Sequence, residues 1–288
     1  MRFEDFKAPL LAGTVASITG TAASIGVVLT ALTALGATAQ QTSTAIFVML
    51  IGYGGLSILL SWRYRMPISI VWSTPGAALL VSSASLGLGF ANAVGAFLVT
   101  GLLLALTGLW PALGRTVSAI PKPIASAMLA GVIFPFCIAP FQSLAAYAPA
   151  ILPALVIWLA LYRFAQVWAA PVAISAAFFG IWIQLGVTVP QAQLLPDFAV
   201  IMPEFNLVAV VGIALPLYLV TMASQNVPGL AIMKSFDFEV PFRPTLVATG
   251  ATTVLGSFFG GFALNLAAIT AALNANEHAH PDRNRRWL

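Results

Sequence analysis

The amino-acid sequence predicts an all-α polytopic membrane protein, and its composition is the first reason. Of the 288 residues, 60% are hydrophobic and only 7% are charged, and the mean hydropathy is +0.98. So few polar side chains cannot cover a water-soluble domain of this length, which means that most of the surface faces lipid. This composition excludes a soluble enzyme and a soluble binding module.

The second reason is the series of apolar runs along the chain. A hydropathy window of about 19 residues separates ten segments. Most of them are long enough for a membrane helix, whereas the third and the tenth are short and interrupted. We place the segments at residues 8–34, 44–62, 68–84, 89–110, 123–141, 149–162, 167–186, 207–233, 245–260 and 262–275.

The third reason is the distribution of charge. If the chain crosses the membrane at every segment, all 12 Lys and Arg residues fall on one side. The loops on the opposite side carry only Asp197 and Glu204 as charged residues. Basic loops stay in the cytoplasm, so we expect a multi-pass protein of the cytoplasmic (inner) membrane with a cytoplasmic N-terminus. The start of the chain has no signal-peptide cleavage pattern, so the first segment is expected to remain.

The segments also indicate an internal repeat. The first and eighth segments begin near residues 8 and 207, which are 199 residues apart, and Trp72 and Asn265 are 193 residues apart. Seven segments per repeat is an odd number, so the second copy would be inverted, as in many secondary carriers. Coincidence is the alternative, because Ala, Leu and Gly are abundant throughout. We predict an inverted-repeat transporter fold of seven plus seven segments, apparently truncated after about ten.

The third and tenth segments each read as an extended stretch followed by a half-helix. Thr74 can cap the first half-helix, with Pro75 in its opening turn, and Asn265 can cap the second. Helix N-termini present unpaired N–H groups and a partial positive charge, which favour an anion. Paired broken segments of this kind predict a binding site near the middle of the membrane.

The eighth segment contributes polar residues at the same depth. Gln225 and Asn226 lie close to Pro228, which removes a backbone donor. Side-chain amides inside a membrane need a hydrogen-bonding partner. They could line a site for a small polar or anionic solute, or they could only hold neighbouring helices together.

Other kinds of site are not supported. No Asp, Glu, Lys, Arg or His lies inside a predicted segment, so no intramembrane proton relay is expected. The chain has no phosphate-binding loop, metalloprotease motif or Ser/His/Asp set, so we expect no enzyme activity and no cofactor. His278 and His280 lie in a terminal loop, and the single Cys137 is expected to be a packing residue, so no metal site is predicted. The basic residues are spread over short loops, which argues against nucleic acid.

Four stretches resemble the benzoate:proton symporter (BenE-type) family, and the similarity covers essentially the whole chain. They are residues 72–80, 222–230, 260–273, and 277–282 together with 285–287. The resemblance implies the fold of the nucleobase and sulfate permease superfamily, with fourteen segments in two inverted repeats. It also implies import of benzoate or a related small aromatic carboxylate together with a proton, across the lipid bilayer.

The same resemblance implies a division into domains and a set of site residues. Residues 1–122 would form the core domain of the first repeat, 123–190 part of a gate domain, and 191–288 the incomplete core of the second repeat. The aromatic acid would bind between the third, eighth and tenth segments. The expected substrate-binding residues are Ser73, Thr74, Gly76, Gln225, Asn226, Phe262 and Asn265.

Two departures from the superfamily pattern keep alternatives open. Its nucleobase carriers have acidic residues in the eighth and tenth segments, where this chain has Gln225 and Asn265, so the coupling residue is not predicted. The chain also stops short of the last four segments. An uncoupled anion channel on the same fold and a non-transporting membrane fragment or scaffold are therefore the alternatives, and a homodimer is left open.

Single cysteines test the predicted orientation, in a chain whose Cys137 is replaced by alanine. We expect Asp197→Cys to react with an impermeant thiol reagent in intact cells, because its loop would face outward. Arg65→Cys should react only after the cells are opened. Labelling of Arg65→Cys in intact cells would contradict the ten-crossing topology.

Overall fold

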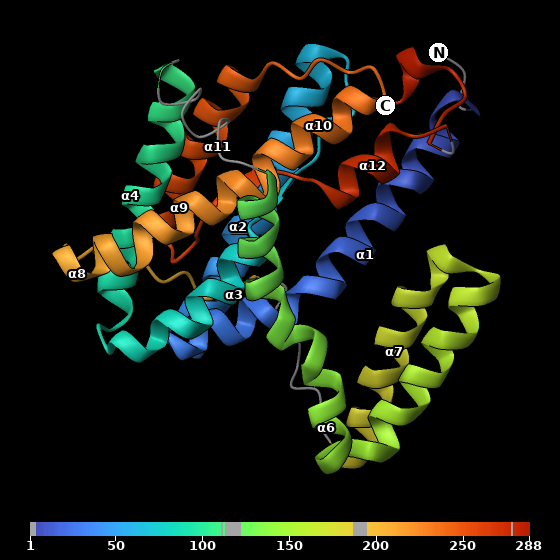
Figure 1. Ribbon diagram of the computed structural model, residues 1–288, viewed down its shortest axis with the longest axis horizontal. Helices are drawn as coiled ribbons and strands as arrows, with labels where there is room; N and C mark the ends of the chain where they lie inside the picture. Colours follow the sequence, from blue (N-terminus) through green and yellow to red (C-terminus); the bar gives the residue numbers. More distant parts are fainter. Residues whose placement is uncertain (1–3, 111, 113–121, 187–194, 278) are drawn as a thin grey trace.

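The computed structural model describes residues 4–110, 112, 122–186, 195–277 and 279–288 (Figure 1). These residues are mostly helical, as predicted. The long helices are α1 (Glu4–Ala34), α2 (Ala39–Tyr64), α4 (Phe90–Leu109), α6 (Lys122–Phe164), α7 (Gln166–Leu185) and α11 (Phe242–Ser257). The shorter elements are β1 (Ile70–Trp72), α3 (Thr74–Ser83), β2 (Leu264–Leu266), α12 (Ile269–Ala275) and the 3-10 turns η1 (Ala84–Leu86) and η4 (Arg283–Arg285).

The eighth predicted segment is a continuous helical rod with two wider turns. It consists of α8 (Leu207–Ala209), the π-helical turn η2 (Val210–Ala214), α9 (Leu215–Thr221), the π-helical turn η3 (Met222–Asn226) and α10 (Val227–Ser235). Pro216 lies two residues after η2, and Pro228 lies two residues after η3. Proline has no N–H and its ring crowds the carbonyl four residues earlier, so the wider turns accommodate both prolines without breaking the rod.

The ten predicted segments coincide with these elements. The fifth and sixth are the two arms of α6, whose backbone leaves helical geometry at Tyr147 (φ −132°, ψ 35°). By length and composition, five helical stretches of the described residues could cross a membrane: 9–34, 39–64, 90–109, 147–164 and 207–235. Two shorter apolar helices cover 74–86 and 172–184. Ten crossings therefore remain a prediction.

The two predicted extended stretches pair with each other as antiparallel strands. In the register of β1 and β2, Val71 lies opposite Asn265, with one further residue pair on either side. Two backbone hydrogen bonds extend the pairing symmetrically: Ser73 N to Ala263 O at 2.9 Å, and Ala267 N to Ser69 O at 2.8 Å. Each strand then leads into a short helix, α3 or α12. This two-fold arrangement of strand–helix units supports the predicted inverted repeat.

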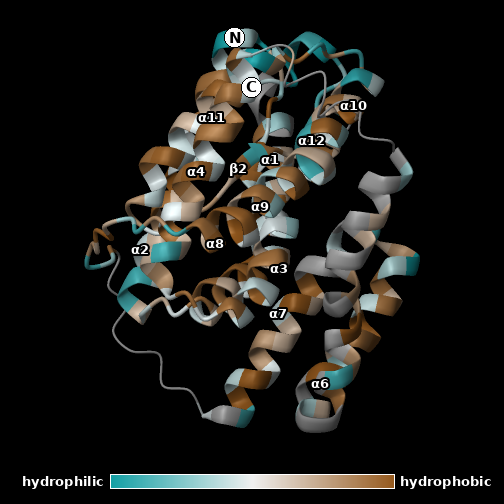
Figure 2. Ribbon diagram, turned by 60° about the vertical axis from the view of Figure 1, so that its left-hand side comes forward, coloured by the Kyte–Doolittle hydropathy of each residue, from teal (hydrophilic) through white to brown (hydrophobic). Residues whose placement is uncertain are grey.

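Helices α6 and α7 lie side by side and project from the rest of the molecule (Figures 1 and 2). They pack mainly on each other and make smaller contacts with α1, α3, α9 and η3. Large apolar side chains on them are exposed, such as Trp168 and Phe179. Cys137 on α6 is also exposed, so the prediction that it packs in the interior is wrong, because its side of the helix faces outward. The gate domain at 123–190 remains a prediction.

The buried core lies among α1 to α4, α9, α11 and the two strands. Phe97, Leu217 and Trp72 are almost completely buried there. Helices α4 and α11 approach most closely where glycines face the opposite backbone. A Cβ atom on Gly250 would lie 2.6 Å from Gly101 O, and one on Gly101 would lie 2.8 Å from Val254 N. Only hydrogen fits at these positions, which allows the two backbones to touch.

We expect Gly250→Ala to lower the free energy of unfolding by about 1 to 3 kcal/mol, because its methyl group would overlap the backbone of α4. Thermal unfolding of the purified protein in detergent measures the effect. Gly26→Ala is the matched control, since a Cβ at Gly26 in α1 meets no atom within 4 Å. Equal unfolding temperatures for the two variants would contradict the close contact of α4 and α11.

Candidate functional site

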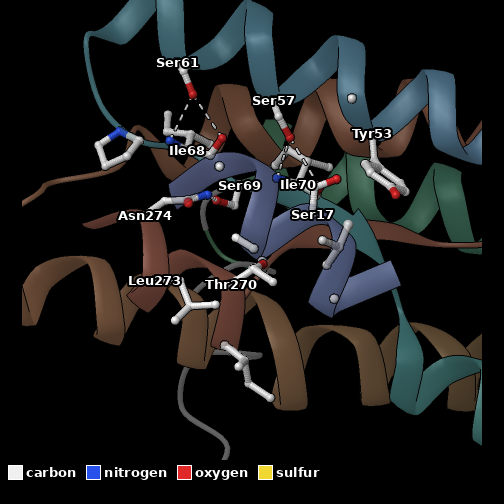
Figure 3. Close-up of a pocket in the computed structure, with 18 of the residues that line it drawn as sticks. Ser17, Tyr53, Ser57, Ser61, Ile68, Ser69, Ile70, Thr270, Leu273 and Asn274 are labelled. Carbon is white, nitrogen blue, oxygen red and sulfur yellow. Dashed lines mark hydrogen bonds between the residues drawn. The ribbon is translucent and has the colours of Figure 1, made fainter. Parts of the chain in front are cut away.

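A cavity of about 680 Å³ lies between α1, α2, β1 and the beginnings of the two short helices. Figure 3 shows part of its lining, with side chains from α1, α2, the β1 region and α12 around the space. Thr74 and Pro75 from the start of α3 line it, as do Ile269 and Thr270 from the start of α12. Gln225 from η3 also lines the cavity. The starts of α3 and α12 and the π-helical turn η3 therefore all border the same cavity.

The cap of α3 is Ser73 and not Thr74, so the predicted cap is wrong by one residue. The backbone is still extended at Ser73 (φ −77°, ψ 93°), and its Oγ accepts a hydrogen bond from Gly76 N at 3.1 Å. The same Oγ accepts a second hydrogen bond from Thr221 Oγ1 at 2.8 Å, which ties α9 to the start of α3. Thr74 is the first helical residue and remains at the cavity wall.

Asn265 does not cap the second short helix, so this prediction is also wrong. It lies inside β2, opposite Val71, and α12 begins only at Ile269 after an Ala268 that makes no side-chain cap. The Asn265 side chain is fully buried, and its Nδ2 donates to Leu266 O at 3.0 Å. Its Oδ1 has no hydrogen-bonding partner among the residues that the structure describes. The strand continues past Asn265 because the pairing with β1 satisfies its backbone.

The neighbouring side-chain amides of Gln225 and Asn226 in η3 have different surroundings. Asn226 is fully buried, and its Oδ1 accepts a hydrogen bond from Leu266 N at 2.9 Å, while Nδ2 contacts Met222 Sδ at 3.4 Å. Gln225 is only partly buried and lines the cavity. Asn226 therefore joins η3 to β2, and Gln225 is the amide that a bound solute could reach.

Gly76 and Phe262 lie behind the cavity wall. A Cβ on Gly76 would be 2.7 Å from Ser73 Oγ, so the glycine is required by the capping turn. Phe262 is fully buried and its ring centroid is 6.0 Å from that of Phe97, within the core. Of the seven predicted substrate-binding residues, Thr74 and Gln225 line the cavity, and the other five are not part of its lining.

Several polar residues of the cavity were not singled out from the sequence. On α2, Ser57 Oγ accepts from Ile70 N at 2.9 Å and Ser61 Oγ accepts from Ile68 N at 3.1 Å (Figure 3). On α1, Thr21 Oγ1 lies 2.9 Å from the Tyr53 hydroxyl. Serines four residues apart share one face of a helix, and this spacing was the available signal.

Among the described residues that line the cavity, one has a charged side chain. Arg286 lies at the end of the cavity formed by the last residues of the chain. Its Nη1 donates to Ala275 O at 2.7 Å and its Nε donates to His280 O at 2.8 Å. These bonds hold residues 279–288 against the end of α12. Within the described part of the chain, no cluster of His, Cys, Asp or Glu could hold a metal, and His278 lies outside it.

Residues 5–288 match the family described as benzoate membrane transport protein (BenE). The chain belongs to this family. Its sequence is 38% identical over 295 residues to inner membrane protein YdcO of Escherichia coli, covering all of this chain and 74% of that protein. It is 29% identical over 252 residues to the benzoate membrane transport protein of Acinetobacter baylyi, covering 84% of this chain and 62% of that protein.

A solved structure supports the fold of this family member. The transmembrane domain of a cyanobacterial bicarbonate transporter, BicA, superposes with a TM-score of 0.67 at 16% identity, covering all of this chain and 80% of that one. At this identity the likeness concerns the fold alone. Together these comparisons confirm the predicted family, the all-α transporter fold and the location in the inner membrane. The side of the membrane on which the N-terminus lies remains a prediction.

Two substitutions distinguish the capping role of Ser73 from the position of Thr74 at the cavity wall. We expect Ser73→Ala to lower the free energy of unfolding by about 1 kcal/mol, because Gly76 N loses its cap. Thr74→Val keeps the shape and removes only a hydroxyl at the cavity, so its unfolding temperature should match the parent. Thermal unfolding in detergent compares the two. Greater destabilisation by Thr74→Val would contradict the assignment of the cap.

Proposed function

We propose that this chain binds benzoate or a related small aromatic carboxylate in the cavity and carries it with a proton across the inner membrane. The supporting observation is that the first residues of α3 and α12 and Gln225 all line the same cavity. The volume of about 680 Å³ lies in the usual range for small-molecule sites. The relative from Acinetobacter baylyi is named a benzoate membrane transport protein, which supports the same class of activity.

The cavity offers both parts of an aromatic acid a matching environment. Its lining is mainly apolar, and Tyr53 and Trp72, whose rings meet edge to face at 5.5 Å, can cover an aromatic ring. The Thr74 hydroxyl and the Gln225 amide can donate hydrogen bonds to the carboxylate. The positive end of the α3 dipole adds to the attraction for an anion. The site thus recognises a carboxylate through neutral donors.

Proton coupling is the finer part of the proposal. The described cavity lining contains no Asp or Glu, so no acidic side chain there can carry the proton. A carboxylate brings its own titratable group, and the proton can travel on the substrate or through water. The same observation favours the second candidate, an uncoupled anion channel, because a channel needs no proton carrier at all.

Binding and transport measurements test the proposal together. We expect the purified protein to bind benzoate and hydroxybenzoates in preference to uracil. Gln225→Ala should weaken that binding by about 1 to 3 kcal/mol, because the carboxylate loses a donor. Gln184→Ala, an exposed glutamine on α7, is the matched control and should bind like the parent. Equal affinities for both variants would remove Gln225 from the site.

Uptake into liposomes then distinguishes the proton symporter from the anion channel and from the non-transporting scaffold. A symporter accumulates labelled benzoate against its gradient only when the external pH is lower than the internal pH. A channel allows benzoate to equilibrate without accumulation driven by pH. Binding without any uptake would favour the non-transporting scaffold.

A further inference from the structure

The cavity extends well beyond the place where Thr74 and Gln225 line it. Its lining on α1 runs from Ser24 back to Pro9, and fifteen residues of helix span about 22 Å. Ser24 marks the end nearest Thr74, because its Oγ accepts a hydrogen bond from Trp72 Nε1 at 2.9 Å. A single-ring acid held at that end leaves the rest of the cavity free.

Arg286 lies at the opposite end of the cavity, as two contacts of α2 show. Tyr53 packs on Trp72 with ring centroids 5.5 Å apart, so it belongs to the Trp72 end. Arg65, which directly follows α2, has its Cζ 4.1 Å from the centroid of the Trp287 ring. Twelve helical residues from Tyr53 to Arg65 span about 18 Å. Arg286 and Trp287 are therefore too distant to share one small solute with Trp72.

The guanidinium of Arg286 has donors to spare. Of its five N–H groups, one donates to Ala275 O and one to His280 O. Among the described residues, Asp282 pairs with Arg285 at 3.4 Å, and no carboxylate lies within ion-pairing distance of Arg286. A half-buried cation without a counter-charge attracts anions, and a guanidinium matches the geometry of a carboxylate.

Aromatic rings accompany this cation. Trp62 of α2 and Trp287 both line the cavity together with Arg286. Arg65 stacks on Trp287 and so holds its ring in place. The Arg286 end therefore combines a positive charge with flat apolar surfaces, which are the two features that an aromatic carboxylate requires.

Polar side chains of α12 lie between the two ends. Thr270 and Asn274 are four residues apart on one face of the helix, and both line the cavity (Figure 3). Asn274 Nδ2 donates to Ser69 Oγ at 2.9 Å, but Asn274 Oδ1 and Thr270 Oγ1 are buried without a partner among the described residues. Buried polar atoms rarely stay unpaired. Either side chain gains a partner by turning toward a solute or water in the cavity.

We propose that Arg286, with Trp62 and Trp287, forms a second binding position for the aromatic carboxylate. The acid occupies it before or after the position at Thr74 and Gln225 and passes Thr270 and Asn274 between the two. This inference rests on the proposed function, since both positions bind the same class of acid. A cation at the second position also raises the local concentration of the anion and speeds its arrival.

Photolabelling of the purified 288-residue chain with 4-azidobenzoate tests the second position. Mass spectrometry of the digested protein locates the modified residues. We expect label at two places, one around Tyr53 and Trp72 and the other around Trp62 and Trp287. Excess benzoate should prevent both.

Four variants assign each label to its position. Arg286→Gln should lower the label around Trp287 at least tenfold and leave the label around Trp72 unchanged, which also shows that the variant is folded. Gln225→Ala should have the reverse effect. Arg285→Gln, the matched control, removes the same charge from an exposed residue outside the cavity lining and should label like the parent. Arg286→Lys keeps the charge and should retain the label around Trp287 within threefold.

Several results would overturn the second position. They are equal labelling of Arg286→Gln and Arg285→Gln, loss of both labels together in Arg286→Gln, and a loss in Arg286→Lys as large as in Arg286→Gln, which would mean that Arg286 only holds its segment. Label around Trp72 alone in the parent would overturn this inference and leave the proposed function standing. A parent with no label that benzoate prevents would overturn both.

Discussion

The fold depends on one requirement, which is that the backbone of two interrupted segments be hydrogen-bonded inside a membrane. Unpaired N–H and C=O groups are costly where no water can reach them. Strands β1 and β2 pair with each other, so their backbone groups are hydrogen-bonded. Three further backbone N–H groups donate to side chains: Ile70 N to Ser57, Leu264 N to Thr253 and Leu266 N to Asn226. Because the strands are fixed in this way, the short helices α3 and α12 begin at the same cavity.

This requirement also explains why polar side chains at membrane depth fall into two groups. Asn226 and Ser73 are fully buried and bond to the framework, whereas Gln225 and Thr74, their immediate neighbours, face the cavity. A hydrogen bond that leaves no buried backbone group unpaired contributes stability, while a hydroxyl or amide left at the cavity is available to a ligand. Residues that stabilise the fold and residues that line the cavity are therefore adjacent in the sequence. A substitution at Ser73 or Asn226 should change stability, whereas one at Thr74 or Gln225 should change ligand binding.

The sequence predicted the elements better than it predicted the site. Apolar length and charge placed all ten segments, and Pro75 and Asn265 marked the two interrupted ones. Ser73 and Thr74 are both of a type that caps helices, and the extended backbone at Ser73 identifies it as the cap. Gln225 and Asn226 could not be separated either, since the π-helical turn changes the direction of each side chain.

The same framework limits where the molecule can change shape. Thr221 is bonded to Ser73 at the start of α3, and Asn226 is bonded to β2 ahead of α12, so the turn η3 between them is tied to both strand–helix units. Glycine contacts lock α4 onto α11 in the same body. Helices α6 and α7 pack mainly on each other and make smaller contacts with α1, α3, α9 and η3. The cavity is lined by α1, α2, β1, α3, η3, α12 and the end of the chain, all outside α6 and α7. A relative movement of α6 and α7 would therefore leave the hydrogen bonds that fix the strands and η3 in place.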